Sequence, residues 1–101
     1  MSSQCLTVMA RFKAKSGQEE IVLDELSALL DPTRQEDGCI QYDLHRSMDD
    51  PGVFVFYESW KSQKDLEQHL AMPYLQALLG KVDELFDEAP QIDLLEKLNC
   101  G

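Results

Sequence analysis

Two histidines are the residues of this chain best suited to proton transfer near neutral pH, because an unperturbed imidazole titrates there. His69 falls three residues after Leu66 and one before Leu70, a spacing that puts all three side chains on one face of a helix. We therefore expect His69 to point inward and to be the first candidate for catalytic proton transfer. The alternative is a buried, hydrogen-bonded histidine that orders the loop before Pro73.

His45 is the second catalytic candidate, and it lies in a predicted strand on the same face as Gln41 and Asp43. It could pair with Asp43, two residues away, or with a group of a second subunit. A structural or interface role is the favoured interpretation of His45.

Aromatic residues near these histidines are candidates for the wall of a cavity that binds a flat substrate. The candidate substrate-binding residues are Trp60, Tyr42, Tyr57, Phe56 and Tyr74. Aromatic side chains also dominate cores and subunit interfaces, so packing is the alternative role for each of them. Three arginines, Arg11, Arg34 and Arg46, could hold anionic oxygens, but we expect them to pair with carboxylates such as Glu58.

The composition excludes several classes of function. The 101 residues include 19 acidic and 9 basic side chains, and a net charge of −10 opposes binding to nucleic acid or to an anionic membrane. No apolar run reaches the roughly 18 residues of a membrane span, and the first residues lack a signal-peptide pattern, so we expect a cytoplasmic protein. The chain has only two histidines, far apart in the sequence, so we expect no metal site. It has no Gly-rich phosphate loop, so the sequence gives no support for a nucleotide cofactor.

Cysteine usage agrees with a reducing compartment. The three cysteines are Cys5, Cys39 and Cys100, an odd number without a CxxC pair. No disulfide framework is therefore predicted. Cys5 and Cys39 are expected at the starts of strands, where a small buried residue is common.

Hydrophobic periodicity predicts the order strand, helix, strand, strand, helix, strand. An alternating strand covers residues 5–15, and a capping box at Ser16 to Glu19 is expected to start a helix that breaks near Pro32. Two strands at 38–46 and 53–60 flank a turn rich in Asp, Pro and Gly. A helix starts at Ser62, another starts at Pro73 and runs through Phe86, and a last strand covers 92–98. The order predicts a single α+β domain over residues 1–101 with the ferredoxin-like βαββαβ fold.

The strand at 53–60 is apolar on both faces, which indicates that both faces are covered. A chain of this length can supply helices for one face only. We therefore expect a partner subunit on the other face, and so a homodimer.

With these segments in view, the chain resembles the antibiotic biosynthesis monooxygenase superfamily, and most closely its small stand-alone quinol monooxygenase branch. The resemblance covers about residues 6–95. The matching segments are Leu6 to Gly17, Pro32 to Arg34, Gly38 to Arg46, Phe56 to Trp60, and His69 to Tyr74.

The resemblance implies a dimeric α/β-barrel made from two four-stranded sheets, with the pocket between each sheet and its helices. It also implies that no flavin, haem or metal cofactor is needed, because a quinol or polyphenol substrate itself supplies electrons to O₂. Trp60 matches a position that the family often uses in its pocket. Haem-degrading relatives place an Asn on the first strand and a His on a later helix, where this chain has Ala10 and Leu78 or Leu79.

Two functions follow as alternatives. The first is a monooxygenase that acts on a small quinol or polyphenol, with His69 as proton acceptor. The second is an isomerase of a small carbonyl compound or a non-catalytic, ligand-binding dimer, because shuttling a proton needs the same His and Tyr side chains.

Overall fold

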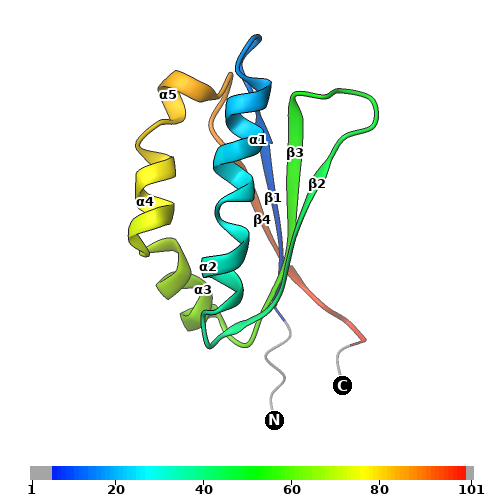
Figure 1. Cartoon of the computed structure of the whole chain (residues 1–101). Helices are drawn as coiled ribbons and strands as arrows, with labels where there is room; N and C mark the ends of the chain where they lie inside the picture. The colour runs from blue at the N-terminus through cyan, green and yellow to red at the C-terminus, as the bar shows by residue number, and fades with distance from the viewer. Residues whose placement is uncertain (1–5, 100–101) are drawn as a thin grey trace.

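The four strands form one antiparallel sheet with the order β2-β3-β1-β4, and all the helices pack on one of its faces (Figure 1). The computed structural model describes residues 6–99. The strands are β1 (Leu6–Lys13), β2 (Cys39–Arg46), β3 (Val53–Trp60) and β4 (Gln91–Glu96). This topology confirms the predicted ferredoxin-like α+β fold.

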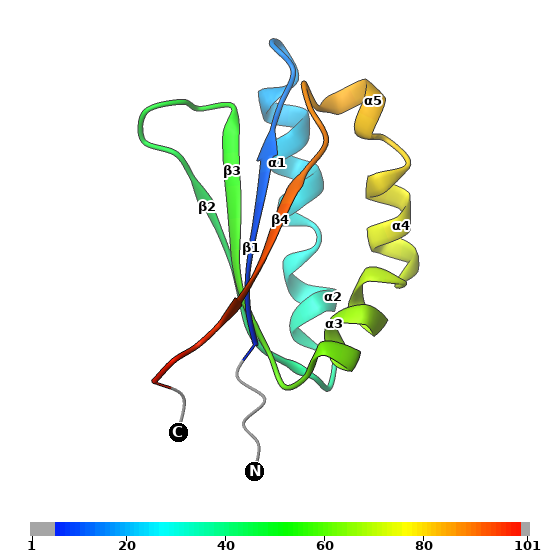
Figure 2. The ribbon, with the colours of Figure 1, turned by 180° about the vertical axis from the view of Figure 1, so that it is seen from behind.

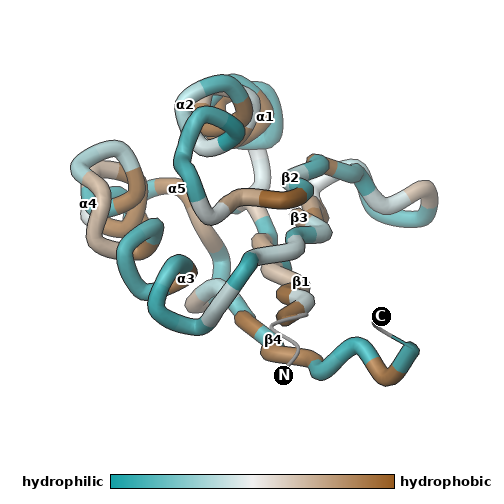
Figure 3. Tube along the Cα trace, turned by 90° about the horizontal axis from the view of Figure 1, so that it is seen from below, coloured by the Kyte–Doolittle hydropathy of each residue, from teal (hydrophilic) through white to brown (hydrophobic). Residues whose placement is uncertain are grey.

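Two helical segments cover the sheet (Figure 3). The first comprises α1 (Glu19–Ser27) and α2 (Leu30–Arg34), and the second comprises α3 (Gln63–Leu70), α4 (Pro73–Leu79) and α5 (Val82–Leu85). Seen from behind, the opposite face of the sheet carries no helix from the described part of the chain (Figure 2). No helix within residues 6–99 has the length and apolar character required to cross a bilayer.

Alternation in β1 creates the core as predicted. Val8, Ala10 and Phe12 are buried toward the helices, whereas Met9 between them is exposed on the other face. In α1, Val22 and Leu26 lie one turn apart and are fully buried against this layer.

The predicted capping box at the start of α1 was wrong. Gln18 occupies the N-cap position, without a side-chain hydrogen bond to the helix. The Glu19 carboxylate instead accepts a hydrogen bond from the backbone N–H of Gly17 at 3.0 Å. Gly17 has a φ of +89°, and this left-handed turn directs the chain away from the geometry that would cap through Ser16.

Two helix boundaries differ from the prediction. The helix breaks at residues 28–29, and Pro32 sits within the first turn of α2, where its missing N–H has little cost. The predicted helix from Pro73 to Phe86 is divided at Gly80 and Lys81 into α4 and α5. The last strand also ends at Glu96 rather than at residue 98.

Cys39 is a free thiol at the start of β2, as expected for a cysteine in a strand. Burial, followed by the nearby carboxylates of Glu36 and Glu58, raises its pKa to about 11. A neutral thiol at this position is a weak nucleophile. Cys5 and Cys100 lie outside the described residues.

Candidate active site

A cavity of about 280 Å³ lies between the inward face of the sheet and helices α3 and α4. Most of its wall is apolar and includes Phe12, Phe56 and Leu75. Its polar groups come from Tyr42 on β2, Glu58 on β3, His69 on α3 and Gln76 on α4. No Lys or Arg side chain lines this cavity within residues 6–99. The volume lies at the lower end of the range of small-molecule pockets, about 300–1,000 Å³.

His69 is anchored by a carboxylate from a distant part of the chain. Its side chain is 2% exposed, and its Nδ1 lies 2.9 Å from Oε2 of Glu36. Glu36 stands between α2 and β2, 33 residues earlier in the sequence. The N-cap of α3 sets the start of the His69 helix, because Ser62 Oγ accepts from the backbone N–H of Asp65 at 3.1 Å.

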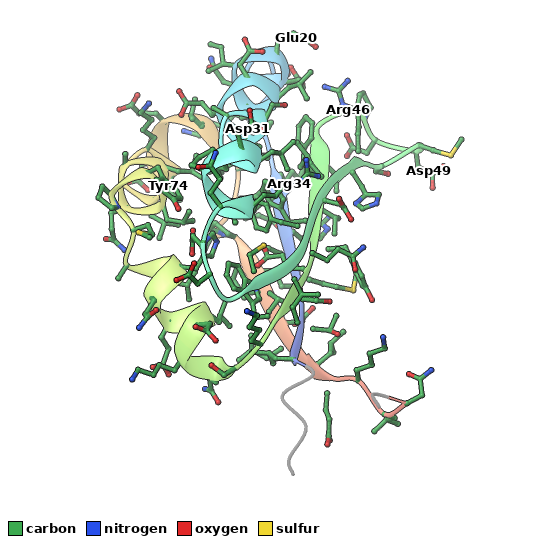
Figure 4. All side chains as sticks on the ribbon, turned by 60° about the horizontal axis from the view of Figure 1, so that its bottom comes forward. Glu20, Asp31, Arg34, Arg46, Asp49 and Tyr74 are labelled. Carbon is green, nitrogen blue, oxygen red and sulfur yellow. The ribbon has the colours of Figure 1, made fainter. Side chains whose placement is uncertain are left out.

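Glu36 Oε2 also accepts a hydrogen bond from the hydroxyl of Tyr74. Tyr74 projects from α4, as Figure 4 shows. Burial, followed by this contact with Glu36, raises the pKa of Tyr74, so the phenol stays protonated and donates. The carboxylate is therefore held by two donors from two helices.

The partner of Nδ1 determines which nitrogen of His69 is free. A carboxylate acceptor requires the proton on Nδ1, so in the neutral ring Nε2 carries the lone pair. Burial lowers the pKa of His69, and this effect outweighs the contact with Glu36, which raises it. The 2.9 Å contact is thus a neutral N–H donating to a carboxylate, rather than an ion pair, at neutral pH.

Nε2 is the ring nitrogen of His69 that does not contact Glu36. Nε2 has no hydrogen-bond partner within residues 6–99. In the same residues, Oγ1 of Thr33 is the only fully buried side-chain oxygen or nitrogen without a partner. His69 itself is one of the residues that line the cavity. The arrangement can accept a proton from a bound ligand.

Aromatic rings surround His69. Its ring centroid lies 4.6 Å from Trp60 and 5.4 Å from Tyr42, and Tyr42 stacks on Phe56 at 4.5 Å. Tyr42 and Phe56 line the cavity, whereas Trp60 is fully buried and lies outside the cavity lining. Burial, followed by the carboxylate of Glu58, raises the pKa of Tyr42, so its hydroxyl remains a donor.

Glu58 is a carboxyl group in an otherwise apolar row. It pairs across the sheet with Tyr42 on one side and Val8 on the other, and it is 4% exposed. Its Oε1 accepts a hydrogen bond from the Trp60 indole N–H at 2.9 Å. Burial raises the pKa of Glu58 to about 7; the Trp60 bond lowers the pKa, and Glu36 raises it further.

Two of the seven predicted site residues lie on the opposite, open face of the sheet. Tyr57 pairs with Met9 and Asp43, and His45 pairs with Val55, all on that face. His45 does not pair with Asp43, whose carboxylate binds Arg34 and Gln41. The other arginines bind carboxylates as expected, Arg11 with Glu88 and Arg46 with Glu20, but none of them binds Glu58.

Sequence reasoning missed Glu36 and Glu58 as site residues. Glu58 could have been recognised from the sequence, because a carboxyl group is unusual on an inward strand face. It shares that face of β3 with Phe54, Phe56 and Trp60. Glu36 could not have been recognised in this way, because it lies in the loop between α2 and β2 and contacts His69 only in the folded chain. Within residues 6–99, no group of three or more Cys, His, Asp or Glu side chains is arranged to hold a metal ion.

Comparisons with known proteins agree with this fold. The family model described as antibiotic biosynthesis monooxygenase matches residues 5–81. The crystal structure of PA3566 from Pseudomonas aeruginosa superposes with a TM-score of 0.90 at 34% identity, covering 97% of this chain and 98% of that one.

Curated relatives of this chain carry activity names. "Putative monooxygenase Rv0793" of Mycobacterium tuberculosis is 32% identical over 93% of this chain and 92% of its own length. "Probable quinol monooxygenase YgiN" of Escherichia coli is 30% identical over 90% of this chain and 89% of its own length. The chain therefore belongs to the antibiotic biosynthesis monooxygenase family.

Proposed function

We propose that this protein is a cofactor-independent monooxygenase that oxidises a small quinol or polyphenol with O₂. The observation that carries the proposal is the Glu36–His69 pair at the wall of an apolar cavity, in which the contact with Glu36 occupies Nδ1 and leaves the lone pair of the neutral ring on Nε2. The activity names of the relatives at 30% and 32% identity support the same reaction class.

In this mechanism His69 accepts the proton of a substrate hydroxyl through Nε2. Glu36 holds the ring in the required tautomer and stabilises the imidazolium that forms. The resulting phenolate is a far better electron donor than the phenol, so it can reduce O₂ directly. The dry, aromatic wall formed by Tyr42 and Phe56 binds the flat ring and keeps water from the reduced oxygen.

The lining also indicates the charge of the substrate. Glu58 and Glu36 place two carboxyl groups in or beside the cavity, and no Lys or Arg of residues 6–99 lines it to balance a carboxylate or phosphate on a ligand. A neutral hydroxylated ring fits this environment better than an anionic one.

The same proposal includes a homodimer. The open face of the sheet exposes large apolar side chains at its centre and edge, including Met9 at 40%, Tyr57 at 37% and Leu95 at 43%. Exposed apolar side chains gathered on one sheet face are typical of an interface. A second copy of this chain is the occupant that the proposal assigns to that face.

Oxygen uptake tests the proposed activity. Purified protein treated with a chelator should consume O₂ with one or more members of a panel of reduced quinols and polyphenols, above autoxidation and with saturation. Heat-inactivated protein provides the background rate. If no member of the panel supports protein-dependent uptake, the monooxygenase assignment is wrong.

One observation favours the second candidate, an isomerase of a small carbonyl compound. Two titratable groups, His69 and Glu58, line the same cavity, and such a pair can move a proton between carbon and oxygen without O₂. Turnover that is unchanged under anaerobic conditions would select this alternative.

A further inference from the structure

Glu58 has a carboxyl oxygen that the proposed role of His69 leaves unused. Its Oε1 is occupied by the indole N–H of Trp60 at 2.9 Å. Its Oε2 has no hydrogen-bond partner within residues 6–99. Among these residues, the fully buried side-chain atom without a partner is Oγ1 of Thr33. Glu58 and His69 line the same cavity.

Burial and the nearby Glu36 carboxylate disfavour the ionised form of Glu58, and the hydrogen bond from Trp60 opposes them only in part. On its own strand it contacts the neutral indole of Trp60, and its cross-strand neighbours are Tyr42 on β2 and Val8 on β1. The α2–β2 connection contributes the Glu36 carboxylate, and α3 contributes the neutral ring of His69.

No Lys or Arg within the described part of the chain lines this cavity to neutralise a Glu58 carboxylate. Burial therefore raises its pKa to about 7, so that a protonated carboxyl group is well populated at neutral pH. A protonated carboxyl group can donate, which the ionised form cannot do.

We propose that Glu58 is a second catalytic residue of the cavity, which in its neutral form donates a proton to the oxygen atom that leaves as water. This proposal rests on the proposed monooxygenase function. It divides the proton transfers between two residues that line the cavity: His69 takes protons from the substrate and returns one to the peroxide, and Glu58 supplies the proton for the leaving oxygen.

The proton donation belongs to the second half of the oxygenation. After the phenolate has reduced O₂, a C–O bond joins the peroxide to a ring carbon that still carries hydrogen, and His69 returns its proton to the distal oxygen. His69 then removes the proton on that carbon, the C–H electron pair forms the new C=O bond, and the O–O bond breaks. The leaving hydroxide takes the Glu58 proton and becomes water.

The overall reaction balances as quinol plus O₂ to hydroxyquinone plus water. One oxygen atom enters the ring and the other is reduced to water, with all four electrons coming from the substrate. The step leaves Glu58 ionised and His69 protonated, and transfer of one proton between them restores the starting state. An acid beside the leaving oxygen accelerates such a step by about 10²–10⁴-fold in typical enzymes.

The first test measures tryptophan fluorescence and needs no enzyme activity. Trp60 is the single tryptophan of the chain, and its indole N–H is hydrogen-bonded to Glu58, so its emission reports on the ionisation of Glu58. Trp60 emission of the wild type should follow one transition with a midpoint near pH 7 between pH 5 and 9. Glu58→Gln, which keeps an acceptor for the indole N–H, should abolish the transition.

His69→Asn separates the effect of the neighbouring imidazole, since Asn can still donate to Glu36. This variant should retain the transition. A wild type without a transition, a transition that survives in Glu58→Gln, or one that disappears in His69→Asn would each overturn the proposed acid. If Glu58→Gln fails to fold, the titrations of the wild type and of His69→Asn still test the proposed acid.

The second test follows kcat against pH for the quinol that gives the fastest O₂ uptake. In the wild type kcat should fall above about pH 7, because the acid ionises there. Glu58→Gln should lower kcat at least 100-fold and remove this limb. Glu88→Gln, the same substitution at an exposed carboxylate paired with Arg11, should retain wild-type kcat and pH dependence.

The outcomes separate the two proposals. A wild type that consumes O₂ while Glu58→Gln keeps its rate and pH profile would remove Glu58 from the mechanism and leave the monooxygenase intact. A wild type that consumes no O₂ with any quinol would overturn both proposals.

Discussion

At the scale of single residues, burial shifts the pKa values of Glu58 and His69, which both line the cavity, in opposite directions. It raises the pKa of Glu58 to about 7 and lowers that of His69. Near neutral pH the cavity therefore holds a neutral imidazole able to accept a proton and a carboxyl group that is partly protonated. Both shifts favour the neutral form of the buried group.

Replacement of His69 by Asn should lower kcat by at least about 100-fold, because Asn can keep the hydrogen bond to Glu36 but cannot accept a proton. The same substitution at His45, which lies on the open face of the sheet, should change kcat less than about twofold. Steady-state O₂ uptake at saturating quinol measures both variants. Equal losses, or a larger loss at His45, would contradict the assignment of His69.

Glu58 also makes stability depend on pH. Its pKa is about 7 in the folded chain and near the ordinary value of 4.5 in the unfolded chain, so folding binds a proton between these values. The free energy of unfolding should therefore fall as pH rises from 4.5 to 7, by up to about 3 kcal/mol from this group.

Glu58→Gln should remove this contribution, so that the variant gains stability relative to the wild type as pH increases from 5 to 8. Urea denaturation at a fixed protein concentration measures the difference at each pH. Parallel stability curves for the two proteins would show that Glu58 is ionised equally in both states.

At the scale of elements, local patterns predicted most of the framework. Alternation identified β1, the Asp- and Gly-rich turn identified the β2–β3 hairpin, and the Ser62 cap and Pro73 marked the starts of α3 and α4. These signals act over a few residues and can be recognised without the fold. The inward face of α3 was equally clear from Leu66 and His69.

The site itself could be predicted only in part, because its contacts join distant segments. His69, Tyr42 and Phe56 were recognised by residue type and by the face that they occupy, and all three line the cavity. Glu36 and His69 are 33 positions apart in the sequence, and no local sequence pattern predicts their contact. Tyr57 was assigned to the cavity, but the alternation of β3 turns it to the other face.

Close packing between the start of β2 and α3 gives a prediction about Gly38. A Cβ added there would lie 2.3 Å from Cβ of Asp65, next to the cap that begins the His69 helix. Gly38→Ala should therefore destabilise the protein by about 1–3 kcal/mol, as overpacking does. Gly80→Ala is the matched control, because its nearest neighbours lie at an ordinary 3.5 Å and its backbone is helical.

Thermal or urea unfolding of the two glycine variants measures this difference. The Gly80→Ala variant should be as stable as the wild type or slightly more stable. If both variants unfold like the wild type, the β2–α3 contact is looser than described.

At the scale of the whole molecule, the helices formed by residues 6–99 all lie on one face of the sheet. The other face presents Met9 beside Tyr57 at the centre, where β1 and β3 pair. A partner sheet on this face would complete the two-sided covering that the apolar sequence of β3 predicts. The candidate active-site cavity lies on the helical side, so a partner on the open face would not cover it.

Tyr57→Glu should therefore convert the proposed dimer into monomers, because it places a charge at the centre of the apolar face. Light scattering coupled to size-exclusion chromatography measures the mass of each species. Ile21→Glu provides the control, because Ile21 is also exposed but lies on α1. A wild-type protein that is monomeric at all concentrations would contradict the dimer.

The fate of the two oxygen atoms tests the central claim most directly. Wild-type protein should be supplied with ¹⁸O₂ and with the quinol that gives the fastest uptake, and the product should be analysed by mass spectrometry. A monooxygenase with this site predicts one ¹⁸O atom in the hydroxyquinone and one in water, and loss of this product in His69→Asn. A product without ¹⁸O, formed with release of hydrogen peroxide or without O₂ consumption, would contradict the account.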